Sequence, residues 1–171
     1  MASKFWGFSL VVYGAQGVEP ECLALQDKFG LDINLLLLCA FVGAMHGIAL
    51  TADDIATARA GVSAWHEDIV KPLRAARRRL KTFALPDARA TDAAAQLRTR
   101  VKAVELESEY VEQLLLERWA EARLALRPRG APRDAVAVNV ATLFESYAVA
   151  EPLAAVTRLI EAALAQTIAQ R

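Results

Sequence analysis

Apolar and polar positions in the first third of the chain repeat with the spacing of α-helices. The third predicted helix, over 33–46, is apolar on every side. Such a helix belongs in the centre of a core, and its longest apolar run has 11 residues, whereas a bilayer span needs about 20. Capping side chains, prolines and glycines at the ends predict three helices here, over 4–14, 19–29 and 33–46.

Two longer apolar stripes with steps of three and four follow. Thr51 and Asp54 have the spacing of a capping box at the start of the first stripe. Its register continues through Pro72, which predicts a kink and not an end. We expect an antiparallel helical hairpin of helices over about 52–83 and 92–126. Its predicted seam consists of Ile55, Ala58, Val62, Trp65, Ile69, Leu73, Ala76, Leu80 and Phe83, facing Leu97, Val101, Val104, Ser108, Val111, Leu115, Ala122 and Leu126.

The end of the chain completes an all-α prediction. A proline- and glycine-rich linker at 127–132 precedes two shorter helices, over about 134–148 and 152–169. No segment has the alternation or the β-branched residues of a strand. The sequence therefore predicts a single-domain helical bundle of about seven helices, 1–171, built around the long hairpin.

The distribution of charge is uneven in a chain whose formal net charge is zero. Between residues 71 and 102 there are ten basic residues and two acidic ones, a net +8, whereas 105–121 and 1–70 each sum to −5 and 122–171 to +2. Neutrality disfavours a general polyanion binder, but the basic segment leaves room for one localised anionic partner.

Four of the basic residues share one helix face. At 100° per residue they lie roughly 135° from the apolar stripe, which predicts a ridge pointing away from the hairpin seam. Three interpretations stay open: a solvated face, pairing with the acidic residues of 1–70, or docking of an acidic protein, a phosphate-bearing ligand or an RNA backbone. Nucleic acid is the weakest of these partners because no aromatic residues are interleaved for base stacking. The ridge residues are Arg74, Arg77, Arg78 and Lys81.

The second group of candidates surrounds one of the two histidines. If the hairpin turns near 87–88, His66 faces Glu109, with Glu105 and Glu112 one turn away on the same side. Such a group is either an acid/base site or a half-buried ionic network. We expect no metal, because one histidine is too few for a transition-metal site of the di-iron type. His46 precedes Gly47 and is expected at a helix C-terminus.

A third group of polar residues lies between the second and third predicted helices. Asp32 as an N-cap and Gly30 as a C-terminal glycine explain part of the pattern, whose order does not match a calcium loop. The rest forms either a buried hydrogen-bond network or the polar side of a ligand pocket. The candidates are Gln26, Asp27, Asp32 and Asn34.

The two cysteines indicate a reducing compartment. Cys22 and Cys39 lie among apolar residues and are expected to be buried free thiols in a reducing environment. The stretch from Phe5 to Tyr13 lacks a clear cleavage site of a signal peptide. We therefore expect a cytoplasmic protein with no membrane span and no cofactor.

Several segments resemble an uncharacterised proteobacterial family of conserved hypothetical proteins, filed as a domain of unknown function. The resemblance covers most of 5–125 and brings no activity and no catalytic residues; it implies a bacterial cytoplasmic origin. It rests on Ala24-Leu25-Gln26-Asp27 with Gly30, Asp32 and Asn34-Leu35-Leu36-Leu37, and on Pro72-Leu73-Arg74 with Arg77-Arg78 and Leu80-Lys81.

Three functional hypotheses follow. The first is a non-enzymatic protein-interaction or regulatory adaptor module that uses the basic ridge. The alternative is a small-molecule-binding protein or enzyme whose pocket lies between helix 33–46 and the hairpin, with the candidates above as polar anchors. A homodimer through helix 152–169 is the third, with an interface of Leu153, Val156, Leu159, Ile160, Leu164 and Ile168.

Overall fold

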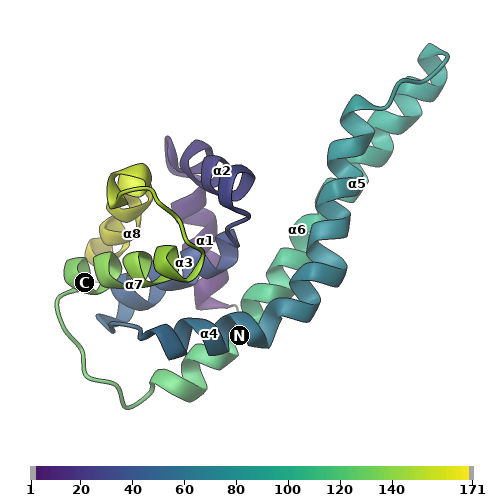
Figure 1. Ribbon diagram of the computed structural model, residues 1–171. Helices are drawn as coiled ribbons and strands as arrows, with labels where there is room; N and C mark the ends of the chain where they lie inside the picture. The colour runs from purple at the N-terminus through teal and green to yellow at the C-terminus, as the bar shows by residue number, and fades with distance from the viewer. Residues whose placement is uncertain (1–2, 170–171) are drawn as a thin grey trace. The chain divides into compact units, whose positions relative to one another are not determined.

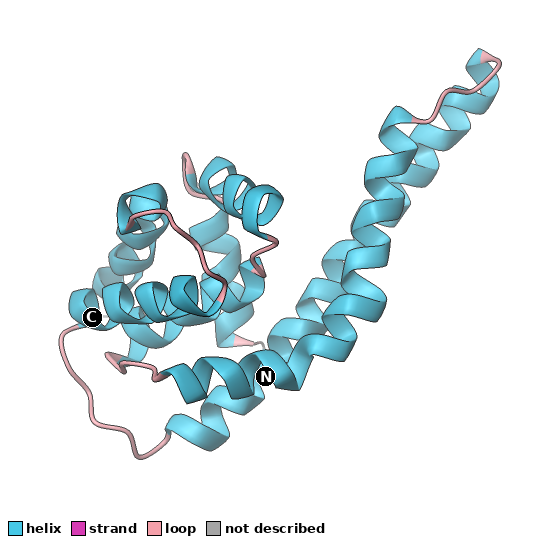
Figure 2. Cartoon of the chain, in the orientation of Figure 1, coloured by secondary structure: helices cyan, strands magenta, loops and turns pink. Residues whose placement is uncertain are grey.

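The computed structural model describes residues 3–169, and its regular secondary structure there is entirely helical (Figures 1 and 2). The all-α prediction is confirmed. The elements are α1 (Lys4–Tyr13), α2 (Val18–Phe29), α3 (Ile33–Phe41), a π-helix η1 (Val42–His46), α4 (Ala52–Trp65), a second π-helix η2 (His66–Val70), α5 (Lys71–Thr82), α6 (Ala88–Leu124), α7 (Pro132–Ser146), a 3₁₀-helix η3 (Leu153–Val156) and α8 (Thr157–Ala169).

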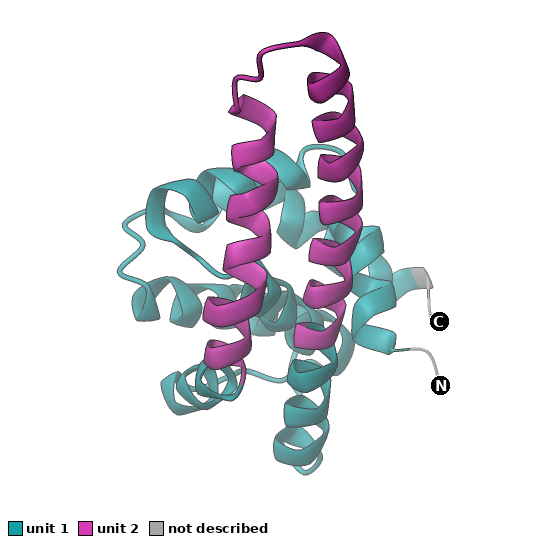
Figure 3. Ribbon diagram, turned by 90° about the vertical axis from the view of Figure 1, so that its right-hand side faces the viewer, with its two compact units in different colours: residues 1–61, 113–171 teal, residues 62–112 magenta. Residues whose placement is uncertain are grey.

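The chain divides into two compact units, coloured separately in Figure 3. Unit 1 comprises residues 1–61 and 113–171, and unit 2 comprises residues 62–112. Helices α4 and α6 each contribute to both units. That the chain forms a single domain stays a prediction.

Unit 1 is built around α3, as its apolar sequence predicts. Every residue of α3 from Asn34 to Phe41 is buried. Phe5 and Phe8 of α1 pack on Phe41 with ring centroids 5.2 Å apart, and α7 packs against α3 and η1. At the closest approach, a Cβ on Gly43 would lie 2.6 Å from the backbone nitrogen of Val136, so only glycine fits there. The predicted helix 33–46 is confirmed in extent, but its last five residues form a π-turn.

A buried amide fixes the segment that follows η1. Asn139 of α7 is completely buried. Its Oδ1 accepts a hydrogen bond from the Leu50 backbone N–H at 2.6 Å, and its Nδ2 donates to the carbonyl oxygens of Cys39 and Ile48 at 3.1 and 3.0 Å. Two of these bonds satisfy backbone groups of residues 48–50, which form no helix of their own.

The start of α4 is a capping box joined to the end of α6. Thr51 and Asp54 exchange hydrogen bonds between each backbone N–H and the other side chain, at 2.9 and 3.2 Å, which confirms the predicted box. Arg123 binds Asp53 and donates from Nε to Asp54 at 2.8 Å, and Arg127 lies 3.1 Å from Asp54. Burial disfavours the Asp54 carboxylate, but the hydrogen bonds from Arg123 and Thr51 and the charge of Arg127 outweigh it and hold the pKa at about 2.

Unit 2 is an antiparallel pair of helical segments (Figure 3). One runs from Val62 through η2 and α5, and the other is the first part of α6 up to Glu112. The irregularity expected at Pro72 lies just before it, in η2. The reason is steric: a proline ring clashes with the carbonyl four residues earlier, here in η2, and the wider π-turn relieves that clash. Accordingly, the N–H of Lys71 bonds to the carbonyl of His66, five residues earlier.

Candidate functional site

The contact between the two helices of unit 2 is polar, contrary to the predicted apolar seam. We call this contact the polar seam. Arg74 donates from Nη2 to Glu109 at 2.7 Å and from Nε to Glu105 at 3.3 Å, and Arg77 binds Glu105 with both Nε and Nη2. His66 Nδ1 lies 3.1 and 3.3 Å from the two carboxylate oxygens of Glu112. Its members are His66, Arg74, Arg77, Glu105, Glu109 and Glu112.

The prediction of a basic ridge pointing away from the seam is wrong for two of its four members. The side chains of Arg74 and Arg77 are only 14 % and 23 % exposed, and they turn toward α6. The cause is η2, whose five residues add about one residue to the turn and rotate every later side chain by roughly 100°. The buried positions therefore shift from Trp65 and Ile69 to His66 and Val70. Internal pairing does occur, and it joins Arg74 and Arg77 to acidic residues of α6.

The partner predicted for His66 is also wrong. His66 binds Glu112, while Glu105 and Glu109 bind arginines of α5. Trp65, one residue earlier, donates from Nε1 to the carbonyl oxygen of Ser108 at 2.9 Å. Glu112 is completely buried and His66 is 7 % exposed. These charged pairs lie within unit 2, and an acid/base role for His66 stays a prediction.

The candidates between α2 and α3 divide into two kinds. Asp32 is the N-cap of α3: its Oδ1 accepts hydrogen bonds from the backbone N–H of Asn34 and Leu35, at 2.8 and 3.4 Å. Asn34 Oδ1 accepts from Gln113 Nε2 at 2.8 Å, and both side chains are buried. Gln26 is half-buried and Asp27 is exposed. The buried members thus form the hydrogen-bond network that the sequence suggested, and Gln113 is the member that sequence reasoning missed.

A pocket in unit 1 lies between α3–η1 and α6, and it has a volume of about 180 Å³. The polar groups in its lining are Lys4, His46, Glu117, Glu121 and Arg129. Burial lowers the pKa of His46, and the nearby charges of Arg129 and Lys4 lower it further, so the imidazole is held neutral. None of the residues predicted to line a ligand pocket belongs to its lining, so the predicted pocket stays a prediction.

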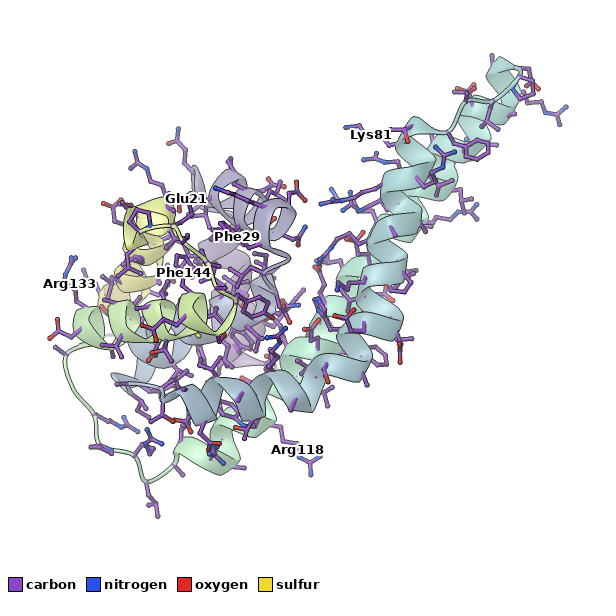
Figure 4. All side chains as sticks on the ribbon, viewed as in Figure 1. Glu21, Phe29, Lys81, Arg118, Arg133 and Phe144 are labelled. Carbon is purple, nitrogen blue, oxygen red and sulfur yellow. The ribbon has the colours of Figure 1, made fainter. Side chains whose placement is uncertain are left out.

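The remaining cations of unit 2 gather toward its loop. We call residues 78–102 the basic end. It carries seven basic residues, of which six are exposed, and only two acidic residues, Asp87 and Asp92. Lys81 lies close to the loop that follows α5 (Figure 4). Arg79 stacks on the exposed ring of Phe83, with the guanidinium carbon 4.7 Å from the ring centroid. The seven are Arg78, Arg79, Lys81, Arg89, Arg98, Arg100 and Lys102.

Residues 4–116 match a protein family whose description is "Protein of unknown function (DUF2390)". The chain belongs to the DUF2390 family. The resemblance to a family of unknown function is thereby confirmed. No curated protein and no solved structure matches the chain.

The part of the chain shared with the DUF2390 family contains all of unit 2 and therefore the polar seam and the basic end. The shared part ends at Leu116, before the linker and α7. Of the DUF2390 chain's helices within residues 3–169, none combines the length and the apolar character that a membrane crossing needs.

The C-terminal helix of this DUF2390 protein uses much of its apolar face inside unit 1. Val156 and Leu159 are completely buried, and α8 packs on α1, α2, α3 and α7. Leu153, Ile160 and Leu164 are half-buried, and Ile168 is 77 % exposed. The homodimer through helix 152–169 stays a prediction, for which the exposed part of this face is small.

Proposed function

We propose that this DUF2390 protein is a non-enzymatic interaction module of the bacterial cytoplasm, whose basic end docks an acidic segment of a partner protein. The supporting observation is the composition of the basic end, which has seven basic residues against two acidic ones in a chain of zero net charge. A local field of one sign accelerates association with an oppositely charged partner and excludes partners of like charge.

The ion pairs of the polar seam determine which cations are available for docking. Arg74 and Arg77 are bound to carboxylates of α6 and contribute little to a surface. Arg78 and Lys81 are exposed on the adjoining turn of α5. On α6, Arg98 is half-buried and Arg100 is exposed. The proposed contact residues are therefore Arg78 and Lys81, with Arg98 and Arg100 on α6.

A protein partner fits this surface better than a nucleic acid does. Binding to single strands combines cations with aromatic rings on which bases stack. Phe83 is the large exposed aromatic side chain of the basic end, and Arg79 already covers one face of its ring. Binding of an acidic peptide requires only the cations of the basic end and no aromatic rings.

Photo-crosslinking in the living bacterium tests the proposal. A photoreactive amino acid replaces Ala84 in the exposed loop after α5, and in a second strain it replaces Glu145 of unit 1 as the control. We expect a crosslinked protein at position 84 and not at 145, with the crosslinks mapping to an acidic segment. The crosslink should be lost in Arg78→Glu/Lys81→Glu. The matched variant Arg118→Glu/Arg133→Glu, with the same charge change at exposed sites in unit 1, should retain it (Figure 4).

Three results would contradict the proposal. These are crosslinking to RNA, no crosslinked species at position 84, and equal loss of the crosslink in both double variants. The last would mean that total charge and not the basic end carries the binding.

The pocket in unit 1 supports a second candidate, a small-molecule-binding protein. Lys4 and Arg129 provide cations, Glu117 and Glu121 carboxylates, and Phe41 an apolar surface. Native mass spectrometry of the purified protein tests it: a co-purified compound should be lost in Ala120→Leu, which fills the pocket. A bare polypeptide mass for the unmodified chain would argue against it.

A further inference from the structure

The apolar stripe that the sequence places on α6 is left largely unused by the hairpin. Leu97, Val104 and Val111 recur every seven residues and are 43 %, 48 % and 36 % exposed. The seam passes instead through Glu105 and Glu112, which are buried. At 100° per residue the stripe lies about 80–120° around α6 from that line. A stripe with coiled-coil spacing thus faces away from the helix that was expected to cover it.

The neighbouring edge of the other helix extends this surface. Trp65 binds the carbonyl of Ser108, which lies on the same side of α6 as Val104. Ile69 follows Trp65 by about one turn and is 37 % exposed. Two helices therefore contribute to one apolar face, which we define as Ile69, Leu97, Val104 and Val111.

We propose that this apolar face binds a second copy of the chain, with the two α6 helices antiparallel about a twofold axis near Val104. In that arrangement Leu97 packs on Val111 of the second copy, and Val104 packs on its own equivalent. A twofold contact needs such a self-complementary patch. On each helix the three apolar positions span two heptads, one on either side of the axis. A short antiparallel coiled coil makes a contact of this kind.

The charges along α6 favour a second copy of the chain as the partner, and they favour the antiparallel arrangement. Arg100 and Glu107 are both exposed and lie on either side of Val104 along α6. The twofold axis brings Arg100 of each chain opposite Glu107 of the other. The exposed cations of the first part of α6 then run beside the later part of α6 of the second copy, which carries the exposed acidic residues Glu107 and Glu121. These cations are Arg89, Arg100 and Lys102. A parallel pair would instead superpose segments of like charge, which specific interfaces avoid.

The small area of this contact indicates a weak dimer. From residue 97 to 111 an α-helix rises about 21 Å, so a contact of helical width falls below the standard interface of roughly 1,600 Å². We therefore expect a reversible dimer with a Kd on the order of 10 µM. This interface shares Arg100 with the docking surface proposed above, but Val104 lies outside that surface, so the variants of Val104 test the dimer separately from the acidic partner.

Sedimentation velocity of the full chain over a range of micromolar concentrations tests the proposal. We expect a concentration-dependent dimer, and Val104→Glu should raise its Kd about tenfold or more, because two like charges would meet at the axis. Leu106→Glu is the matched control: it has the same exposed fraction, 48 %, but lies about 200° around α6. It should leave the Kd unchanged.

The orientation has two tests of its own. Arg100→Glu and Glu107→Arg should each weaken the dimer several-fold, and the double variant should restore it. Val104→Cys should form an intermolecular disulfide on mild oxidation, whereas Leu106→Cys should not; Cys22 and Cys39 are buried and do not interfere. Four results would overturn the proposal: a monomer at every concentration, equal effects of the two glutamate variants, failure of the double variant to restore association, or a dimer lost in Ile168→Glu but kept in Val104→Glu.

Discussion

Replacement of Arg74 by methionine tests whether the polar seam holds unit 2 together. Methionine keeps the length and the apolar stem of the side chain and removes only the guanidinium. In the structure that group binds Glu109 at 2.7 Å and Glu105 at 3.3 Å, and its side chain is 14 % exposed. If Arg74 stood on an outward ridge, the same change would cost within about 0.5 kcal/mol, as is usual at the surface.

The magnitude follows from the contacts that are lost. A hydrogen bond to a charged group contributes about 1.5–3 kcal/mol, and removing one partner of a buried ion pair costs about 3–5 kcal/mol. Two circumstances reduce that cost: Glu105 keeps Arg77, and Glu109 is 25 % exposed, so water can solvate its carboxylate. We expect Arg74→Met to lower the free energy of unfolding by about 2–3 kcal/mol.

Urea denaturation followed by far-UV circular dichroism measures this free energy. Hydrogen exchange of the amides in residues 71–112 then locates the loss in unit 2. Lys81→Met is the control, since it removes a cation from an exposed position on the same helix and should cost within about 0.5 kcal/mol. A difference between the two variants smaller than about 0.5 kcal/mol would refute the assignment of Arg74 to a stabilising seam.

Three further predictions concern unit 1. Gly43→Ala should lower the melting temperature, because its Cβ would meet the Val136 backbone at 2.6–2.7 Å and overpacking costs about 1–3 kcal/mol; an unchanged melting temperature would contradict this close approach. The pKa of Asp54, about 2 against an ordinary 3.8, adds about 2 kcal/mol of stability above about pH 4 that is lost as the pH falls toward 2. The urea concentration at the midpoint of unfolding should therefore fall more steeply between about pH 4 and pH 2 in the wild type than in Asp54→Asn. Parallel curves for the two proteins would contradict the lowered pKa of Asp54. Burial, and then the charges of Glu21 and Glu19, raise the pKa of Cys22 to about 12, so neither it nor the buried Cys39 should react with a thiol reagent at pH 8 until urea unfolds the chain.

The ends of the helices could be predicted because they are set by single residues with strong local preferences. Asp32 caps α3, and Gly30 and Gly47 adopt left-handed conformations with φ of 64° and 65° that other residues avoid. Pro132 is an exception: it was predicted to belong to the linker, but it begins α7, in the first-turn position where its missing N–H costs nothing. The all-apolar sequence of α3 likewise required a central position, and it has one.

The facing surfaces of the hairpin could not be predicted by the same reasoning. The helical-wheel argument assumes 100° per residue throughout, and η2 interrupts that regularity one residue after Trp65. It also assumes that the seam is apolar, so Glu105 and Glu112 were assigned to the flank of α6. One signal is present in the sequence: Arg74 and Arg77 are three residues apart and Glu105 and Glu109 are four residues apart, so each pair lies on one face of its helix. The seven basic residues beyond Arg77 share their segment with only two acidic residues, so the net positive charge of the basic end can be counted from the sequence.

The polar seam also determines the axial position of α5 along α6. Leucines and valines are nearly interchangeable as partners, so an apolar hairpin can slide by one turn, about 5.4 Å, at small cost. The same slide would separate Arg74 from Glu109 and His66 from Glu112, and it would leave buried carboxylates without counter-ions. The spacing between Lys81 on one helix and Val104 on the other is therefore constant, and a ligand that touches both must match that length.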